Sequence, residues 1–149
     1  MNAANTIHFV GAGPGDAELI TVKGARLLRE ADVVVYAGSL VDFKLVRTYA
    51  PGARIFDSAA MDLEQTTQVL AQAALDGEKV VRLHTGDASI YGAIQEQMAE
   101  LDRLGLSYEV VPGVTSAFAA AATLKQELTL PEVSQTVIIT RLAGRTPVP

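Results

Sequence analysis

The feature that most constrains this chain is the alternation of short apolar, mostly β-branched runs with longer stretches of helical spacing. Each run has the length of a strand and is apolar enough to be covered on both faces. This alternation is typical of βα units, so we expect an α/β fold with a five-stranded, mostly parallel sheet flanked by helices. The expected strands are residues 7–10, 32–36, 54–56, 79–83 and 108–111.

Helical spacing fills the intervals between these strands, and turn residues mark where the helices stop. Pro51-Gly52, Asp76-Gly77 and Gly105 follow three of them, and Asp62 is placed to cap the start of another. The expected helices are residues 21–31, 42–49, 62–75 and 90–104, with a further alanine-rich segment at 117–124 that should pack closely against something. After it we expect an extended connector at 127–131 and a sixth strand at 136–140.

Composition limits both the location and the chemistry of the protein. A chain of 149 residues with 49% hydrophobic and 19% charged residues can bury a core without disulfides. The absence of cysteine excludes thiolate metal sites and is typical of a reducing compartment, so we expect a cytoplasmic protein and no metal. No apolar run could span a bilayer, and the N-terminus does not look like a signal peptide. The net charge of −5, without a Lys/Arg run, argues against nucleic acid as a partner.

A glycine-rich loop, Gly11-Ala12-Gly13-Pro14-Gly15-Asp16, follows the first strand. Open α/β sheets bind ligands at this edge, and the loop superficially suggests a dinucleotide site. The dinucleotide fingerprint fails here, because Asp16 replaces its third glycine and the second strand does not end in an acidic residue. Pro14 lacks an amide donor and Asp16 would repel a pyrophosphate. A structural turn and a ligand site both remain open for this loop.

Two more glycine-containing loops follow the fourth and fifth strands. In residues 84–92, Asp87 or Ser89 could cap the next helix, and Asp87 could instead hold an amino or hydroxyl group of a ligand. In residues 112–116, Thr115 or Ser116 could likewise be either a cap or a ligand contact. We expect all three loops to lie at one edge of the sheet.

Taken in order, these segments resemble the tetrapyrrole methylase family, S-adenosylmethionine-dependent enzymes of cobalamin and sirohaem synthesis. The first signature of the family resembles residues 7–16 with 19–24, and its second strand resembles residues 31–36. Residues 36–41, 82–87, 112–118 and 127–136 look most like the precorrin-4 branch of the family.

The resemblance implies a methyl donor bound in a cleft between two α/β domains. Carried over residue by residue, the donor site consists of Pro14, Thr85, Gly86, Asp87, Ile90, Thr115 and Ser116. S-adenosylmethionine is then the co-substrate and a tetrapyrrole of the precorrin-4 type, with or without cobalt, is the substrate. Methyl transfer needs no covalent nucleophile from the protein, and relatives form homodimers. Arg141 and Arg145 are candidates for binding the substrate carboxylates.

The chain departs from the family pattern in three places. Ala88 stands where the family usually has proline, which loosens that turn. Ala37 stands where sirohaem-type relatives carry an aspartate considered a proton acceptor, which argues against the uroporphyrinogen branch. The resemblance also runs only into the first strand of the second domain. We therefore expect an N-terminal domain at 1–126, and at 127–149 a linker with the first strand of a truncated second domain.

Two rival functions remain at this stage. One is a nucleotide-dependent oxidoreductase, which the first glycine loop suggests superficially. The other is a non-catalytic binding or dimerisation module. Binding of NADH without binding of S-adenosylhomocysteine would favour the first rival, and a folded dimer that binds neither would favour the second.

Overall fold

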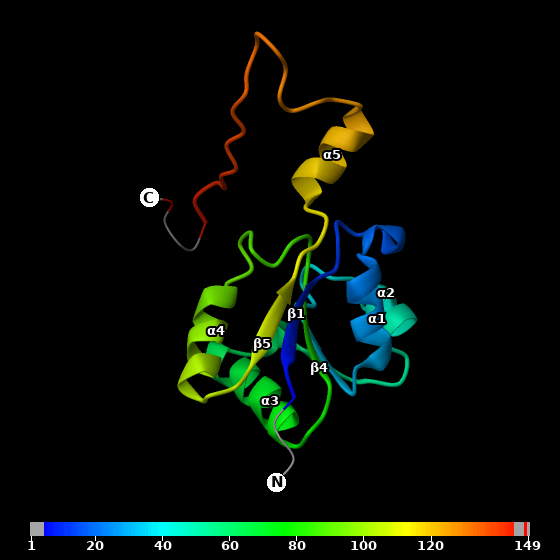
Figure 1. The fold of residues 1–149 in the computed structure, drawn as a ribbon, viewed down its shortest axis with the longest axis vertical. Helices are drawn as coiled ribbons and strands as arrows, with labels where there is room; N and C mark the ends of the chain where they lie inside the picture. The colour runs from blue at the N-terminus through cyan, green and yellow to red at the C-terminus, as the bar shows by residue number, and fades with distance from the viewer. Residues whose placement is uncertain (1–4, 145–147, 149) are drawn as a thin grey trace. The chain divides into compact units, whose positions relative to one another are not determined.

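The computed structural model describes residues 5–144 and 148 and contains a five-stranded parallel sheet (Figure 1). The order of the strands is β3-β2-β4-β1-β5, and every strand pair is parallel. The expected α/β class is confirmed. The strands are β1 (Ile7–Gly11), β2 (Val33–Tyr36), β3 (Arg54–Asp57), β4 (Val80–His84) and β5 (Tyr108–Val111).

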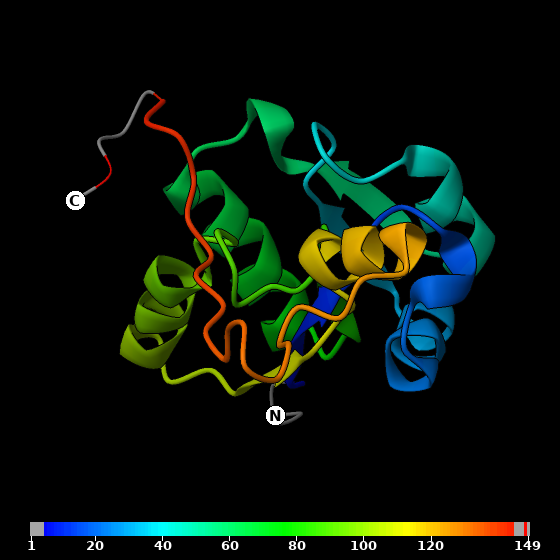
Figure 2. The ribbon, with the colours of Figure 1, turned by 90° about the horizontal axis from the view of Figure 1, so that it is seen from above.

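Helices cover both faces of this sheet, α1 and α2 on one face and α3 and α4 on the other (Figure 2). The helices are α1 (Val22–Glu30), α2 (Phe43–Tyr49), α3 (Leu63–Leu75), α4 (Ile94–Arg103) and α5 (Ser116–Leu124), with short 3-10 turns at Ala17–Leu19 and Ser58–Ala60. Such two-sided cover explains why the strands are apolar at successive positions rather than at alternate ones.

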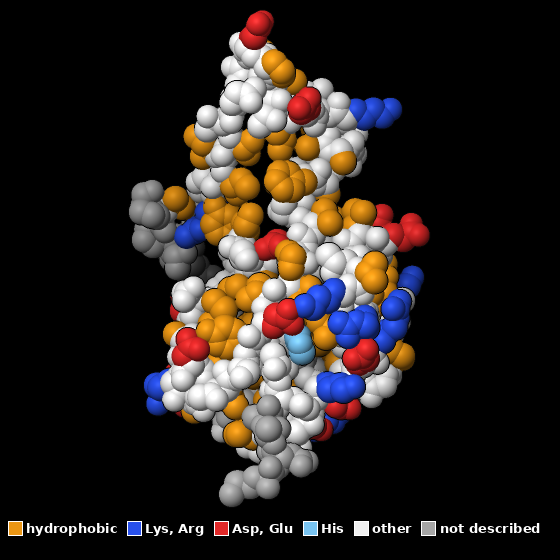
Figure 3. Space-filling model, in the orientation of Figure 1, with side chains coloured by type: hydrophobic (Ala, Val, Ile, Leu, Met, Phe, Trp, Pro, Cys, Tyr) orange, Lys and Arg blue, Asp and Glu red, His pale blue; other side chains and the backbone are white. Residues whose placement is uncertain are grey.

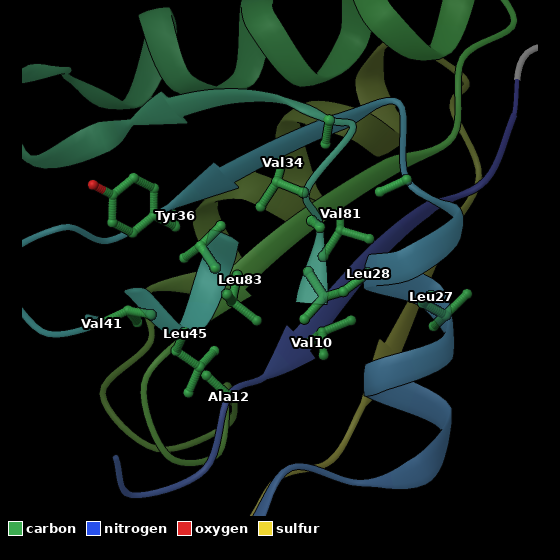
Figure 4. Packing of buried hydrophobic residues seen from close by; sticks show 14 of the residues in the cluster. Val10, Ala12, Leu27, Leu28, Val34, Tyr36, Val41, Leu45, Val81 and Leu83 are labelled. Carbon is green, nitrogen blue, oxygen red and sulfur yellow. The ribbon is translucent and has the colours of Figure 1, made fainter. Parts of the chain in front are cut away.

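Alternate side chains along each strand enter two separate cores. On the α1 and α2 face, Val34 and Val81 pack with Leu28 and Leu45 (Figure 4). On the α3 and α4 face, Phe9 and Val35 belong to the second core. Because successive side chains of a strand point to opposite faces, each strand contributes to both cores.

Capping side chains fix where the helices begin. Thr21 accepts a hydrogen bond from the Gly24 amide at 3.0 Å, and Asp42 accepts one from the Lys44 amide at 2.8 Å. Asp62 caps α3 as predicted, and its side chain and that of Gln65 form a reciprocal capping box. These bonds satisfy amides that the first turn of a helix leaves without partners.

Two expectations about this part of the chain were wrong. β3 is an edge strand, and its four residues are exposed or half-buried rather than covered on both faces. The helix expected from residue 90 begins only at Ile94, because Tyr91 and Ala93 have φ values of 55° and 49°. These left-handed conformations interrupt a right-handed helix.

The chain divides into two compact units, Met1–Ser116 and Ala117–Pro149. Within the second unit, Leu130 and Ser134 form an isolated antiparallel bridge, and α5 has no buried residue despite the close packing expected of it. Residues 136–140 form no strand, contrary to expectation. A strand requires a ladder of backbone hydrogen bonds to a neighbouring strand, and residues 136–140 form no such ladder within the described part of the chain. The domain boundary expected at 126/127 stays a prediction.

Candidate functional site

Three loops meet at the carboxyl ends of the adjacent strands β4, β1 and β5. We call them the rim loops: residues 11–16 after β1, residues 85–89 after β4 and residues 112–116 after β5. Because the strands are parallel and adjacent, these loops emerge side by side, although more than 90 positions of sequence separate the first from the last. The expected convergence of three glycine loops at one edge is therefore confirmed.

Glycines bring the main chains of the rim loops into direct contact. A Cβ atom on Gly11 would lie 2.5 Å from the Gly86 carbonyl oxygen and 2.7 Å from the Cα atom of Gly113. A Cβ atom on Gly113 would collide with the same Gly86 oxygen and lie 2.8 Å from the Cα atom of Gly11. Only residues without a side chain allow this approach. Gly86 also has φ +58°, a conformation that favours glycine.

Asp87 joins two of the rim loops through its side chain. Its Oδ1 atom accepts a hydrogen bond from the Ser89 amide at 2.8 Å, and its Oδ2 atom accepts one from the Gly113 amide at 2.8 Å. Of the two alternatives left open for this loop, the helix cap is not formed, because α4 starts five residues after Ser89. Asp87 instead closes a local turn and holds the loop that follows β5.

The structure brings most of the predicted donor-site residues to this rim. Pro14 is half-buried in the first rim loop. In the second rim loop, Thr85 is exposed and Gly86 is buried. The Cα atom of Thr115 lies 3.6 Å from the position a Cβ of Gly86 would take, and the Ser116 amide nitrogen lies 3.9 Å from it. Ile90 is half-buried in the turn that follows Ser89.

A small hollow opens beside these loops. Its lining includes Gly13, Gly15 and Thr85 from the rim loops, and Leu40 and Asp42 from the segment that leads into α2. A Cβ on Gly15 would meet nothing within 4 Å, so this part of the first rim loop faces open space. At about 20 Å³ the hollow holds no more than a water molecule, so a ligand as large as an adenosyl group would have to lie on the open rim outside it.

Larger hollows lie away from the rim and have a different character. One of about 450 Å³ is lined by side chains of both charge signs near the amino ends of the strands. There Glu109 pairs with Lys23 and lies 3.6 Å from His8, and Arg26 pairs with Glu30. Figure 3 shows acidic and basic side chains intermingled on the first unit. Cavity size therefore does not point to the rim loops, and the donor site expected there stays a prediction.

Neither of the two candidates for binding the substrate carboxylates belongs to the rim loops. Arg141 belongs to the second compact unit, where its Nη1 atom donates a hydrogen bond to the Leu142 carbonyl oxygen at 3.3 Å. Arg145 lies outside the described residues. Their role stays a prediction from the resemblance.

Sequence reasoning missed two buried polar side chains beneath the rim. Arg82 is 6% exposed and His84 4% exposed, both in the central strand β4. The Arg82 Nε atom donates to Gln97 Oε1 at 3.1 Å and its Nη1 atom donates to the Val35 carbonyl oxygen at 3.3 Å. The sequence signal for them was that polar residues, Arg82 and His84, alternate with apolar ones at the end of an otherwise apolar strand.

Burial shifts the protonation of both side chains. Desolvation, with the nearby Arg82 charge, lowers the pKa of His84 to about 3, so the imidazole is neutral at pH 7. Desolvation also lowers the pKa of Arg82 to about 10, which leaves its guanidinium charged. His84 stacks on Phe9 with ring centroids 6.1 Å apart, and its Nε2 atom has no hydrogen-bond partner within the described chain.

A second acidic side chain, Asp57, organises the ends of β2 and β3. Its Oδ1 atom accepts hydrogen bonds from the Gly38 amide at 3.0 Å and the Ala59 amide at 2.8 Å. Burial, and then the Asp57 carboxylate, raise the pKa of Tyr36. The position of Asp57 at a strand end was the sequence signal that could have found it.

The described residues offer neither a metal-binding cluster nor a membrane-spanning helix. Within residues 5–144 and 148, no three His, Cys, Asp or Glu side chains are grouped so that they could hold a metal ion. In the same residues, no helix has the length and apolar character needed to cross a membrane.

The parallel sheet, its glycine rim loops and their sequence define the class of protein. The chain belongs to the tetrapyrrole (corrin/porphyrin) methylases, whose family model matches residues 6–148. Among individual relatives, it is 58% identical over 149 residues to the cobalt-precorrin-4 C(11)-methyltransferase of Methanocaldococcus jannaschii. This alignment covers 100% of the chain and 58% of that relative.

Solved structures give the same result. The X-ray structure of a cobalamin biosynthetic enzyme, cobalt precorrin-4 methyltransferase, matches with a TM-score of 0.91 and 53% identity. The match covers 97% of this chain and 60% of that one. The uroporphyrin-III C-methyltransferase of Thermus thermophilus complexed with S-adenosylhomocysteine matches with a TM-score of 0.67 and 38% identity, over 78% of this chain and 48% of that one. The chain therefore spans less than two thirds of the proteins it resembles.

Proposed function

We propose that this chain is the donor-binding part of an S-adenosylmethionine-dependent methyltransferase that methylates precorrin-4 or cobalt-precorrin-4 at C11, in cobalamin biosynthesis. The relatives at 58% and 53% identity carry these names, and the related Thermus enzyme was solved with S-adenosylhomocysteine. The observation that carries the proposal is the rim itself, where three glycine loops join into one main-chain surface.

The charge of this rim favours a sulfonium over a phosphate. Asp16 follows the first rim loop's glycines, Asp42 lines the hollow and Asp87 lies in the second rim loop. Carboxylates attract a positively charged sulfonium and repel a pyrophosphate. The same charges disfavour the rival function of a nucleotide-dependent oxidoreductase.

The rim residues offer an adenosyl ligand open space and hydrogen-bonding groups. Gly15 leaves open space, and the exposed Thr85 and Ser116 provide hydroxyl groups at the rim. We propose that the donor site comprises Pro14, Thr85, Gly86, Asp87, Ile90, Thr115 and Ser116, with Arg141 and Arg145 toward the substrate carboxylates. No metal is part of this proposal.

In this reaction the protein has to position the methyl donor against the tetrapyrrole carbon and to exclude water from between them. S-adenosylmethionine supplies an electrophilic methyl group, and the electron-rich tetrapyrrole carbon attacks it in line. Such a displacement requires the reacting atoms at about 3–3.5 Å and aligned, which a rigid main-chain surface provides. The joined glycines limit movement of the rim, and Pro14 shapes its wall with a fixed φ.

Calorimetric titration of the chain with S-adenosylhomocysteine and with NADH tests this function. We expect binding of S-adenosylhomocysteine and none of NADH. The reverse result would contradict the proposal in favour of an oxidoreductase, and a folded chain that binds neither would support a non-catalytic module. The proposal includes a homodimer in the cytoplasm, and light scattering checks the dimer.

A further inference from the structure

Asp87 uses both carboxylate oxygens on main-chain amides, and this geometry separates it from the other residues of the proposed donor site. Its Oδ1 atom holds the amide two positions further on, Ser89, and its Oδ2 atom holds Gly113 across 26 positions of sequence. We infer that Asp87 is a positioning residue, which fixes the 112–116 loop against the 85–89 loop and does not itself contact the methyl donor. This inference rests on the proposed function.

The packing around Gly86 makes the position of the 112–116 loop depend on this bond. The Gly86 carbonyl oxygen lies against the main chains of both Gly11 and Gly113, where no Cβ atom would fit. Gly86 is also tied to the first rim loop by backbone bonds with Gly13. Since Asp87 follows Gly86 directly, its carboxylate ties Gly113 to a peptide that is already held on the other side.

The positions of Thr115 and Ser116 depend on how Gly113 is held against Gly86. Both lie within 4 Å of the position a Cβ of Gly86 would occupy, and they follow Gly113 by two and three residues. A shift of the Gly113 peptide therefore changes the spacing between Gly86 and these residues. Loss of the Asp87 carboxylate would weaken donor binding through that spacing.

A related junction elsewhere in the described residues serves as a control. Asp57 also accepts from the amide two positions further on, Ala59, and from a glycine amide on another loop, Gly38, but a single oxygen, Oδ1, accepts both bonds. It connects the ends of β2 and β3, whereas Asp87 connects the loops after β4 and β5. Asp57→Ala thus removes a carboxylate that joins two loops outside the proposed donor site.

The first test measures the clamp directly by NMR. In the wild-type chain we expect a scalar coupling across the hydrogen bond between the Gly113 amide nitrogen and the Asp87 carboxyl carbon. In Asp87→Ala, which removes both acceptor oxygens, the amide proton of Gly113 should exchange with solvent about tenfold faster, the factor expected for one charge-assisted hydrogen bond. Asp57→Ala should leave Gly113 unchanged and affect Gly38. Absence of the coupling, or unchanged exchange in Asp87→Ala, would overturn the inference.

The second test separates positioning from direct contact with the donor. Affinities of wild type and Asp87→Ala are measured for S-adenosylhomocysteine and for analogues that each lack one polar group: the amino acid portion, a ribose hydroxyl or the base amino group. Positioning predicts that Asp87→Ala weakens all of them by the same factor, about tenfold. If one analogue is insensitive to the substitution, Asp87 contacts the missing group and the inference is wrong.

Failure of the proposed function has a different signature. A wild-type chain that binds none of the adenosyl ligands contradicts the donor site as a whole. In that case the coupling between Asp87 and Gly113 still decides whether the clamp exists, because it is measured without a ligand. If only the affinity of Asp87→Ala departs from the expected uniform loss, the donor site stands and the positioning role falls.

Discussion

Gly13 and Gly86 exchange two backbone hydrogen bonds at the carboxyl edge of the sheet. The Gly13 amide donates to the Gly86 carbonyl oxygen at 3.2 Å, and the Gly86 amide donates to the Gly13 carbonyl oxygen at 2.8 Å. β1 and β4 run parallel up to this point. The antiparallel bridge therefore marks where the segments that follow these two strands turn out of the sheet. The rim loops are therefore joined by main-chain bonds as well as by close packing.

The close contact between Gly113 and Gly86 should not tolerate a methyl group on Gly113. In Gly113→Ala the new Cβ would collide with the Gly86 carbonyl oxygen, which belongs to main chain and cannot rotate away. We expect the free energy of unfolding to fall by about 3 kcal/mol, as in overpacked cores. Urea denaturation followed by circular dichroism measures it.

Gly52→Ala is the matched control for this substitution. A Cβ at Gly52 would meet nothing within 4 Å, and its φ lies outside the left-handed region. The free energy of unfolding should be unchanged or higher by up to about 1 kcal/mol. Equal losses in the two variants would contradict the contact at Gly113.

Acid should destabilise the protein through His84. Burial lowers the pKa of His84 to about 3 in the folded chain, while its ordinary value is 6.5. Below pH 6.5 the unfolded chain binds a proton that the folded chain does not, so stability falls as the pH falls from 6.5 toward 3. Between pH 7 and pH 5 this side chain should account for about 2 kcal/mol of lost stability.

His84→Phe isolates this effect. Urea denaturation at the two pH values should show a drop for the wild type that is larger than the drop for the variant by that amount. His8, whose pKa burial also lowers, contributes equally to both chains. A pH dependence that is the same in both would show that His84 is not responsible.

The buried guanidinium of Arg82 depends on Gln97. No carboxylate forms an ion pair with Arg82 in the residues the structure describes, and Gln97 Oε1 accepts from its Nε atom at 3.1 Å. Gln97→Leu leaves that donor buried and unpaired, which should lower the free energy of unfolding by about 2–3 kcal/mol. Thermal and urea denaturation measure the loss.

Removing the charge as well should restore stability. In the double variant Arg82→Met with Gln97→Leu, both polar partners are replaced by apolar side chains of similar size. Such replacements are often close to neutral, so most of the loss should be recovered. Additive losses in the double variant would contradict this account of the pair.

The capping box of α3 should be visible in stability and should depend on an acceptor rather than on charge. Asp62→Ala removes the acceptor of the Gln65 amide and should lower the free energy of unfolding by about 1 kcal/mol. Asp62→Asn keeps an acceptor oxygen and should remain within a few tenths of a kcal/mol of the wild type. A loss in Asp62→Asn equal to that in Asp62→Ala would show that charge matters more than the hydrogen bond.

Local chemistry was enough to predict most of the elements. The apolar runs located all five strands of the sheet, and Asp62 marked the start of α3, because strand burial and helix capping depend on nearby residues. The prediction of secondary structure failed where an element depends on a partner from elsewhere in the fold. Residues 136–140 are apolar and β-branched enough for a strand, but pairing requires a second chain segment that the sequence pattern does not supply.

The sequence by itself determined that this chain builds a parallel α/β sheet, carries glycine loops after three of its strands and belongs with the tetrapyrrole methylases. The tertiary structure decided which loops become neighbours, because the strand order places β1 between β4 and β5. It also decided that Asp87 holds Gly113 and that Arg82 and His84 are buried. These facts depend on contacts between residues far apart in sequence, and such contacts exist only once the chain has folded.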